Sequence, residues 1–230
     1  MAIIELRELA KEAQRDYASE IVAGLVNNEI RDLQSEIDEA SEVSFIELNS
    51  GRGWRIYRRT VMFVLFTAVH EMYPSAEVVA QFSANKGVFC ELQHFGGGVS
   101  DDIVCNIEKR MREIIAEDIP IVKMKMDREQ AIKIFKNSRQ IEKANLISSL
   151  NMDKVSLYQC GEFYDYLYGV MLGHTGSLTQ FALDVEAGGI LLRIPDMDTG
   201  GAVRQRIPQP KLSQILAESR QWAQALQCNF

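Results

Sequence analysis

The chain has 230 residues, of which 25 are Lys or Arg and 32 are Asp or Glu, so its formal net charge at pH 7 is −7. Hydrophobic residues make up 47% of it, enough for the core of one or two domains. The acidic balance excludes a surface that is basic overall, although charge can still gather in a local patch. The most apolar run, Val61 to Val69, is about half of what a membrane span needs, and the N-terminus lacks the layout of a secretory signal. We therefore expect a soluble, cytoplasmic protein with no membrane part.

The first 50 residues predict a very small α+β unit. Apolar residues recur at helical spacing from Ile3 to Ala13, which indicates an amphipathic helix. Two strands follow, Ile21 to Val26 and Val43 to Leu48, and Asn27-Asn28 forms a turn after the first of them. Two glycines within residues 49–53 indicate a boundary before a new element.

The second part predicts longer elements. A buried stripe from Trp54 to Met72 indicates a long helix that ends before Pro74, and a hairpin joins strands 78–82 and 88–92. Ser100 is the expected N-cap of the next helix, and Asp127 that of a later one. Further expected elements are strands within 119–126, 155–157 and 178–194, a short helix at 141–150, a turn at Gly188-Gly189, and a terminal helix after Pro208 and Pro210.

Motifs that carry chemistry are scarce. The glycine-rich stretches are not followed by the Lys-Ser or Lys-Thr of a phosphate-binding loop, and no Ser or Cys lies in a nucleophile motif. The four cysteines are far apart and indicate neither a disulfide framework nor a zinc knuckle. Of the three histidines, His174 lies in a glycine-flanked loop that suits a site. We expect no metal site.

Two polar groups remain as candidates. Arg55 and Arg59 are one helical turn apart and would present two guanidinium groups toward phosphate or carboxylate, although a solvated helix face explains them too. A tyrosine cluster that includes Tyr166 and Tyr168 could line a base-stacking or small-ligand pocket, or simply pack in a hairpin.

From Tyr57 to Pro195 the chain resembles the editing-type domain of threonyl- and alanyl-tRNA synthetases, on the segments 68–74, 108–111 and 162–165. The first 48 residues resemble the later part of a TGS domain, a ubiquitin-like module. The combination resembles the front of bacterial uridine (nucleoside) kinase-like proteins, on the segments 55–59, 83–91, 165–169 and 189–195. The expected fold class is therefore α+β, with a partial TGS-like unit at 1–50, an editing-like domain at 51–207 and a C-terminal helix at 208–230.

The chain departs from the editing family at the metal ligands. Where the family has H-x-x-x-H, this chain has Tyr57 and Val61, and where the family has C-x-x-x-H, it has Leu167 and Met171. These side chains cannot rebuild a zinc site. The resemblance thus implies that metal-dependent deacylation of mischarged tRNA is absent.

The functional expectation follows from that departure. The chain is expected to be a non-catalytic accessory region of a nucleoside kinase, whose ATP- and Mg²⁺-dependent phosphorylation lies in a kinase domain absent from this chain; the alternative is a free-standing tRNA-editing relative of threonyl-tRNA synthetase. The expected ligand is a nucleoside, a nucleotide, an amino acid or an RNA end. Seven residues are the candidate ligand-binding set: Arg55, Arg59, Lys86, Tyr166, Tyr168, His174 and Arg193.

Overall fold

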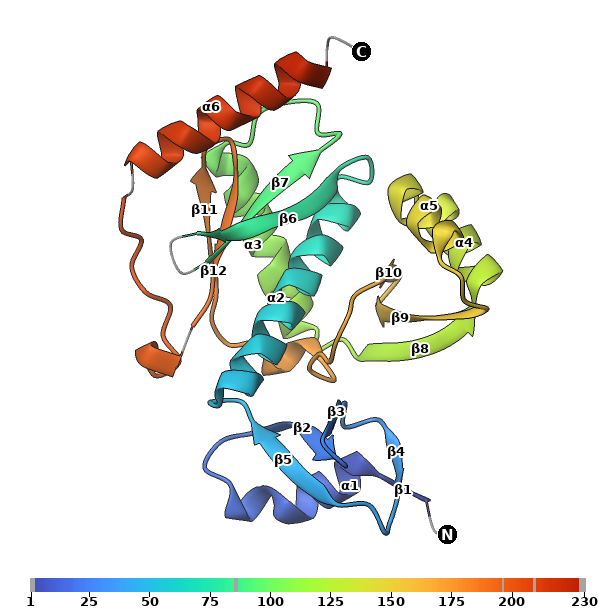
Figure 1. The fold of residues 1–230 in the computed structure, drawn as a ribbon. Coiled ribbons are helices and arrows are strands. Elements are labelled where there is room, and N and C mark those ends of the chain that lie inside the picture. Colours follow the sequence, from blue (N-terminus) through green and yellow to red (C-terminus); the bar gives the residue numbers. More distant parts are fainter. Residues whose placement is uncertain (1–2, 85–86, 196, 209, 228–230) are drawn as a thin grey trace.

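The computed structural model describes residues 3–84, 87–195, 197–208 and 210–227, and it confirms a mixed α+β fold. Within these residues the strands form four separate sheets. Figure 1 shows a small N-terminal unit at the bottom, one long helix rising from it, and a sheet on either side of that helix.

The N-terminal unit holds one helix and two small sheets. Its elements are β1 (Ile3–Glu5), α1 (Leu6–Ala13), the 3₁₀ turn Gln14–Asp16, β2 (Ile21–Val26), β3 (Glu29–Arg31), β4 (Glu36–Asp38) and β5 (Val43–Glu47). Strand β2 pairs with β3 and β5, and β1 pairs with β4. The predicted helix and both predicted strands are present, and Asn27 and Asn28 form the turn at positive φ. The expected helical start at Ile3 was wrong, because Ile3 and Ile4 pair with Asp38 and Ile37 as a strand.

Helix α2 (Gly51–Met72) lies between the two larger sheets of the molecule (Figure 1). It begins inside the predicted boundary segment, where the Ser50 hydroxyl accepts the amide N–H of Gly53 at 3.0 Å. A Cβ on Gly53 would lie 2.1 Å from the carbonyl oxygen of Glu47, so only glycine permits this close approach to β5. From Ile56 to Val69 nearly every side chain is buried, as expected of a helix covered on several sides.

A four-stranded antiparallel sheet covers one side of α2. Its order is β11-β12-β7-β6, from β6 (Glu77–Ala84), β7 (Gly87–Gln93), β11 (Ala182–Glu186) and β12 (Gly189–Arg193). The predicted run at 178–194 thus divides into two strands, and positive φ at Ala187 and Gly188 makes their turn. Helix α3 (Asp101–Ala116) packs against α2 and β11, and it begins at the predicted cap Ser100.

A three-stranded sheet and two helices lie on the other side of α2 (Figure 1). The sheet has the order β10-β9-β8, from β8 (Ile121–Asp127), β9 (Lys154–Cys160) and β10 (Phe163–Asp165). Helices α4 (Arg128–Asn137) and α5 (Ile141–Ser149) bury a separate small core against it, built on residues such as Phe135, Ile147 and Leu157.

The chain ends in α6 (Pro210–Gln227), which follows Pro208 as predicted and crosses the top of the molecule in Figure 1. A 3₁₀ turn, Met197–Thr199, lies in the segment before it. The buried carboxylate of Glu186 accepts hydrogen bonds from Arg206, at 2.7 Å, and from Ser213. These contacts fasten the C-terminal segment to the end of β11.

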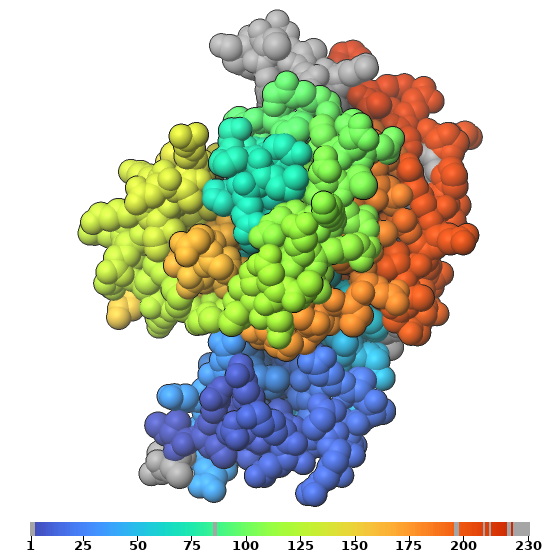
Figure 2. Space-filling model, turned by 180° about the vertical axis from the view of Figure 1, so that it is seen from behind, coloured from blue at the N-terminus to red at the C-terminus, as the bar shows by residue number. Residues whose placement is uncertain are grey.

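The N-terminal unit forms a lobe below the rest of the molecule (Figure 2). Val22, Ala23 and Ile46 from this lobe join the same apolar core as α2. Two polar contacts add to the junction: the Gln34 amide donates to the carbonyl oxygen of Ile121 at 3.2 Å, and the Ser177 hydroxyl donates to Glu20 at 2.9 Å. The domain division at residue 50 stays a prediction. Among the described residues, no helix has the length and apolarity to cross a membrane.

Candidate functional site

A wide cleft of about 800 Å³ opens between the N-terminal unit, the first turns of α2 and the paired strands β8 and β9. Strand β3 forms one wall, and the segment 166–170, which follows β10, forms another. The volume falls in the range of typical ligand sites and is large enough for a nucleotide. The elements that meet here are far apart in the sequence, so the cleft exists only because of the tertiary fold.

Cations dominate this cleft. Its lining contains a single carboxylate, Glu29, whose side chain lies 2.5 Å from Arg31. The cationic side chains number seven: Arg31, Arg52, Arg55, Arg59, Lys123, Lys125 and Lys154. A concentration of positive charge in a protein of net charge −7 is a local electrostatic feature that attracts anions.

The lysines reach the cleft because of strand alternation. Lys123 and Lys125 are two residues apart on β8 and therefore share one face of the sheet. In the antiparallel register Lys125 lies opposite Ser156, and Lys154 extends the same row on β9. All three are exposed. The other face of this sheet packs against α4 and α5.

The arginines of α2 divide into two kinds. Arg52 and Arg55 are exposed, and within the described part of the chain neither has a carboxylate within salt-bridge distance. Arg59 is half-buried and donates from Nη1 to the carbonyl oxygen of Val170. Burial lowers the pKa of Arg59, but a guanidinium keeps its charge in proteins. Arg59 thus fixes the cleft wall, whereas Arg52 and Arg55 are available to a ligand.

Four of the seven candidate residues line this cleft: Arg55, Arg59, Tyr166 and Tyr168. Arg31 and the lysines of strands β8 and β9 were not predicted from the sequence. A signal for two of them was present, since the alternating Lys-x-Lys of 123–125 on a predicted strand places both lysines on one face.

Two other candidates, His174 and Arg193, lie elsewhere. His174 binds Asp118 through Nδ1, and its Nε2 lies 3.1 Å from the Ser177 hydroxyl. This hydrogen bond lowers the pKa of the Asp118 carboxyl. Arg193 on β12 is bound to Asp184 at 2.5 Å. Lys86 lies outside the described residues. His174 and Arg193 therefore do not belong to the cleft, since neither is among its lining residues.

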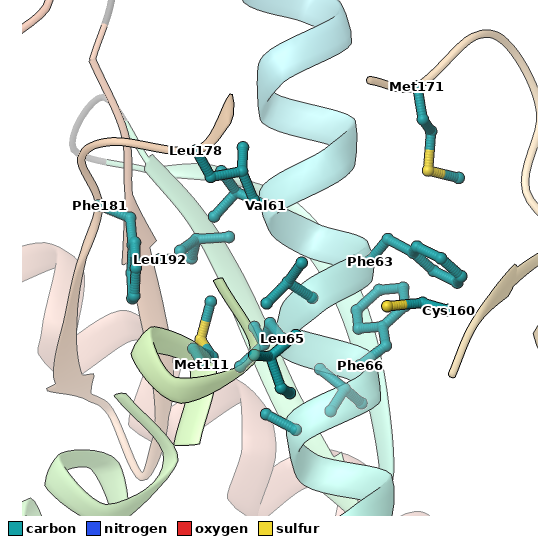
Figure 3. Packing of buried hydrophobic residues seen from close by; sticks show 14 of the residues in the cluster. Val61, Phe63, Leu65, Phe66, Met111, Cys160, Met171, Leu178, Phe181 and Leu192 are labelled. Atoms are coloured by element: carbon teal, nitrogen blue, oxygen red, sulfur yellow. The ribbon is translucent and has the colours of Figure 1, made fainter. Parts of the chain in front are cut away.

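The metal positions that the resemblance implies are occupied by side chains of other chemistry. Tyr57 is fully buried, and its hydroxyl accepts the amide N–H groups of Thr179 and Gln180. Figure 3 shows Val61 beside Leu178 on one side of α2, whereas Met171 and Phe63 lie on the other. Tyr57 and Val61 therefore do not converge with Leu167 and Met171.

The residues of α2 that do approach segment 167–171 are Arg59, at Val170, and Phe63 (Figure 3). They have the same four-residue spacing as Tyr57 and Val61, so the register inferred from the resemblance was wrong by two residues. Arginine and phenylalanine fit a zinc site no better, because zinc takes thiolate, imidazole or carboxylate. Among the residues that the structure describes, no group of three or more His, Cys, Asp or Glu could hold a metal ion.

A second, much smaller pocket of about 40 Å³ lies between α2, β6 and the start of α5. Lys143 lines it, and its Nζ lies 2.8 Å from the buried carboxylate of Asp165. One oxygen of Asp165 and one of Gln140 are buried without a hydrogen-bond partner. His70 and Glu77 also face this pocket. Burial lowers the pKa of His70 and raises that of Glu77.

Comparison with known proteins identifies threonine–tRNA ligases as relatives. No family model matches the chain. A threonine–tRNA ligase of Desulforamulus reducens is 32% identical over 185 residues, which are 79% of this chain and 28% of the ligase. Ligases of the same name from Syntrophotalea carbinolica and Polynucleobacter asymbioticus are 31% and 30% identical, over 74% and 81% of this chain and 27% and 29% of their own lengths.

The chain thus spans less than a third of the curated relatives it matches. These relatives agree with the synthetase part of the resemblance and give no support to its nucleoside kinase part. The chain is therefore a homologue of one region of threonine–tRNA ligases, of the TGS and editing-like type.

Proposed function

We propose that this chain is an RNA-binding module that holds the phosphate backbone of a tRNA-like RNA in its basic cleft. The observation that carries the proposal is the cluster of cations in the cleft, of which Arg52, Arg55, Lys125 and Lys154 have no ion pair within the described residues. Uncompensated Lys and Arg side chains bind RNA phosphates and release their counterions. An exposed Lys or Arg side chain is hydrated in the free protein, and a bound phosphate replaces part of that water.

The relatives support RNA as the polyanion. They are threonine–tRNA ligases by name, so their substrate is a tRNA. The proposal carries tRNA binding over to this chain. Catalysis is not carried over, because Arg59, Phe63, Leu167 and Met171 cannot hold the zinc of the editing family. An accessory role beside a nucleoside kinase lacks support among the relatives.

The test is RNA binding by a charge-reversal variant. We expect the protein to bind a tRNA transcript with an affinity that falls steeply with salt, and Arg52→Glu combined with Arg55→Glu to weaken binding by at least about tenfold. The matched control is Lys109→Glu combined with Lys211→Glu, which makes the same change in net charge on α3 and α6. Equal losses in the two double variants would contradict a site in the cleft.

The comparisons favour a second candidate, hydrolysis of mischarged tRNA. Its test is incubation of the purified protein with a mischarged tRNA, with and without a chelator. We expect no chelator-sensitive hydrolysis. Rapid hydrolysis that the chelator abolishes would show that the chain is a metal-dependent editing enzyme.

A further inference from the structure

The feature from which we argue is Tyr168, at the rim of the basic cleft. Tyr168 is 95% exposed, the highest exposure of any large hydrophobic residue in the described part of the chain. A single exposed apolar side chain needs no explanation by itself. Tyr168 differs because hydrogen bonds fix the neighbouring backbone and because cations line the cleft around it.

The backbone beside Tyr168 is anchored from beneath. The Tyr158 hydroxyl donates to the carbonyl oxygen of Gly169 at 2.5 Å, and Arg59 donates to that of Val170. On the other side, the amide N–H of Tyr166 donates to the buried carboxylate of Asp165 at 2.7 Å. Burial raises the pKa of the Tyr158 hydroxyl, which therefore remains a donor at neutral pH. The segment is thus fixed while the phenol ring of Tyr168 extends into solvent.

Because the backbone is already fixed, binding by this ring orders only its side-chain torsions, which limits the cost of association. The surroundings specify the ligand. Cations that suit phosphates line the same cleft, and two further apolar side chains are exposed there, Ile30 at 41% and Met152 at 42%. Cations along a backbone path, with an aromatic face beside it, are how proteins bind single-stranded nucleic acid.

We propose that Tyr168 is a stacking platform for an unpaired base, so that the cleft selects single-stranded RNA, such as an RNA end, over duplex RNA. This inference rests on the proposed function and deepens it. In a duplex the bases already stack on one another and have no free face for the ring, whereas their phosphates remain open to the cations. Tyr168 therefore contributes to single-strand binding alone, and the lysines and arginines contribute to both.

The experiment compares two RNA probes with three variants. The probes are a fluorescently labelled single-stranded octanucleotide and a blunt-ended duplex, each titrated at the same salt concentration. Tyr168→Ala is expected to weaken binding of the single strand by about 5- to 150-fold and to leave duplex binding within about twofold. Tyr168→Phe keeps the aromatic face, so it should bind both probes like the unaltered protein. Trp222→Ala, a change to an aromatic residue that is 72% exposed on α6, is the control expected to have no effect.

A second readout is independent of affinity. A single strand that contains 2-aminopurine should lose fluorescence when its base stacks on Tyr168, and Tyr168→Ala should remove this quenching. Equal losses for single strand and duplex, or no loss for either, would overturn the stacking inference while RNA binding in the cleft stands. Absence of salt-dependent binding of both probes by the unaltered protein would overturn the proposed function itself.

Discussion

The basic cleft lies at the N-terminal end of α2 and the small pocket around Lys143 at its C-terminal end, and the lysines in the two places have opposite surroundings. In the cleft, Lys125 and Lys154 are exposed and have no carboxylate partner within the described chain. In the pocket, Lys143 is 2.8 Å from Asp165, whose side chain is only 1% exposed. An exposed unpaired cation contributes little to folding and is available to a ligand, whereas a buried pair is costly to break.

This difference gives a rule for substitutions. Changes to exposed cations of the cleft should reduce RNA affinity and leave the free energy of unfolding nearly unchanged. Changes to the Lys143–Asp165 pair should do the reverse. The predictions below test the rule, from the largest expected effect to the smallest.

Asp165→Ala should have the largest effect. It leaves the Lys143 ammonium without its partner and the amide of Tyr166 without its acceptor, so we expect a loss of about 3 to 5 kcal/mol in the free energy of unfolding. Urea denaturation measures it. The double variant with Lys143→Met no longer has the unpaired ammonium group, so it should regain part of the lost free energy of unfolding. If the single variant loses less than about 1 kcal/mol, the pair is not a stabilising contact.

Gly169→Ala tests an exception to the rule, because Gly169 is a cleft residue whose backbone is constrained. Its φ is +95°, and an added Cβ would lie 2.7 Å from the Arg59 guanidinium carbon. We expect a loss of about 2 to 3 kcal/mol in the free energy of unfolding, together with weaker RNA binding as Arg59 moves.

The matched control for that change is Gly161→Ala. Gly161 also has a positive φ, +57°, but an added Cβ would meet nothing within 4 Å. Only the backbone cost remains, about 1 kcal/mol, and RNA affinity should not change. Similar losses in both variants would mean that contact with Arg59 does not matter.

Lys125→Ala should have a smaller effect, confined to binding. Each cation that contacts a phosphate of single-stranded RNA contributes about 0.7 to the slope of log affinity against log salt concentration. We expect the slope to become shallower by that amount and thermal stability to stay the same. Lys109→Ala, on the α3 face, should leave the slope unchanged. A slope unaltered by Lys125→Ala would place the RNA away from β8.

The sequence predicted the elements that local pattern determines and missed those that depend on distant partners. Helix α2, the cap at Ser100 and the hairpins were expected from periodicity and turn residues. The three-residue strands β1, β3, β4 and β10 were not, since so short a strand is defined by its pairing. The cleft shows the same limit. Arg55 and Arg59 are neighbours on one helix, but Arg31 and Lys154 come from strands 123 residues apart and meet only in the fold.

His70→Gln should have the smallest effect and concerns the pocket. Burial, and next the charge of Lys143, lower the pKa of His70 below its ordinary 6.5. As the pH falls through 6.5, the unfolded chain therefore binds a proton at His70 before the folded protein does, and the free energy of unfolding falls with it. Urea titrations at pH 7.5 and pH 5 should show this loss in the unaltered protein and a smaller one in His70→Gln.

Glu77 in the same pocket acts in the opposite direction. Burial raises its pKa above 4.5, so the folded protein binds a proton there before the unfolded chain does, and stability gains as the pH falls toward 4.5. In His70→Gln the opposing effect of His70 is absent, so the free energy of unfolding should fall less steeply as the pH is lowered toward 4.5. If the free energy of unfolding falls with pH identically in His70→Gln and the unaltered protein, the pocket does not hold His70 in its neutral form.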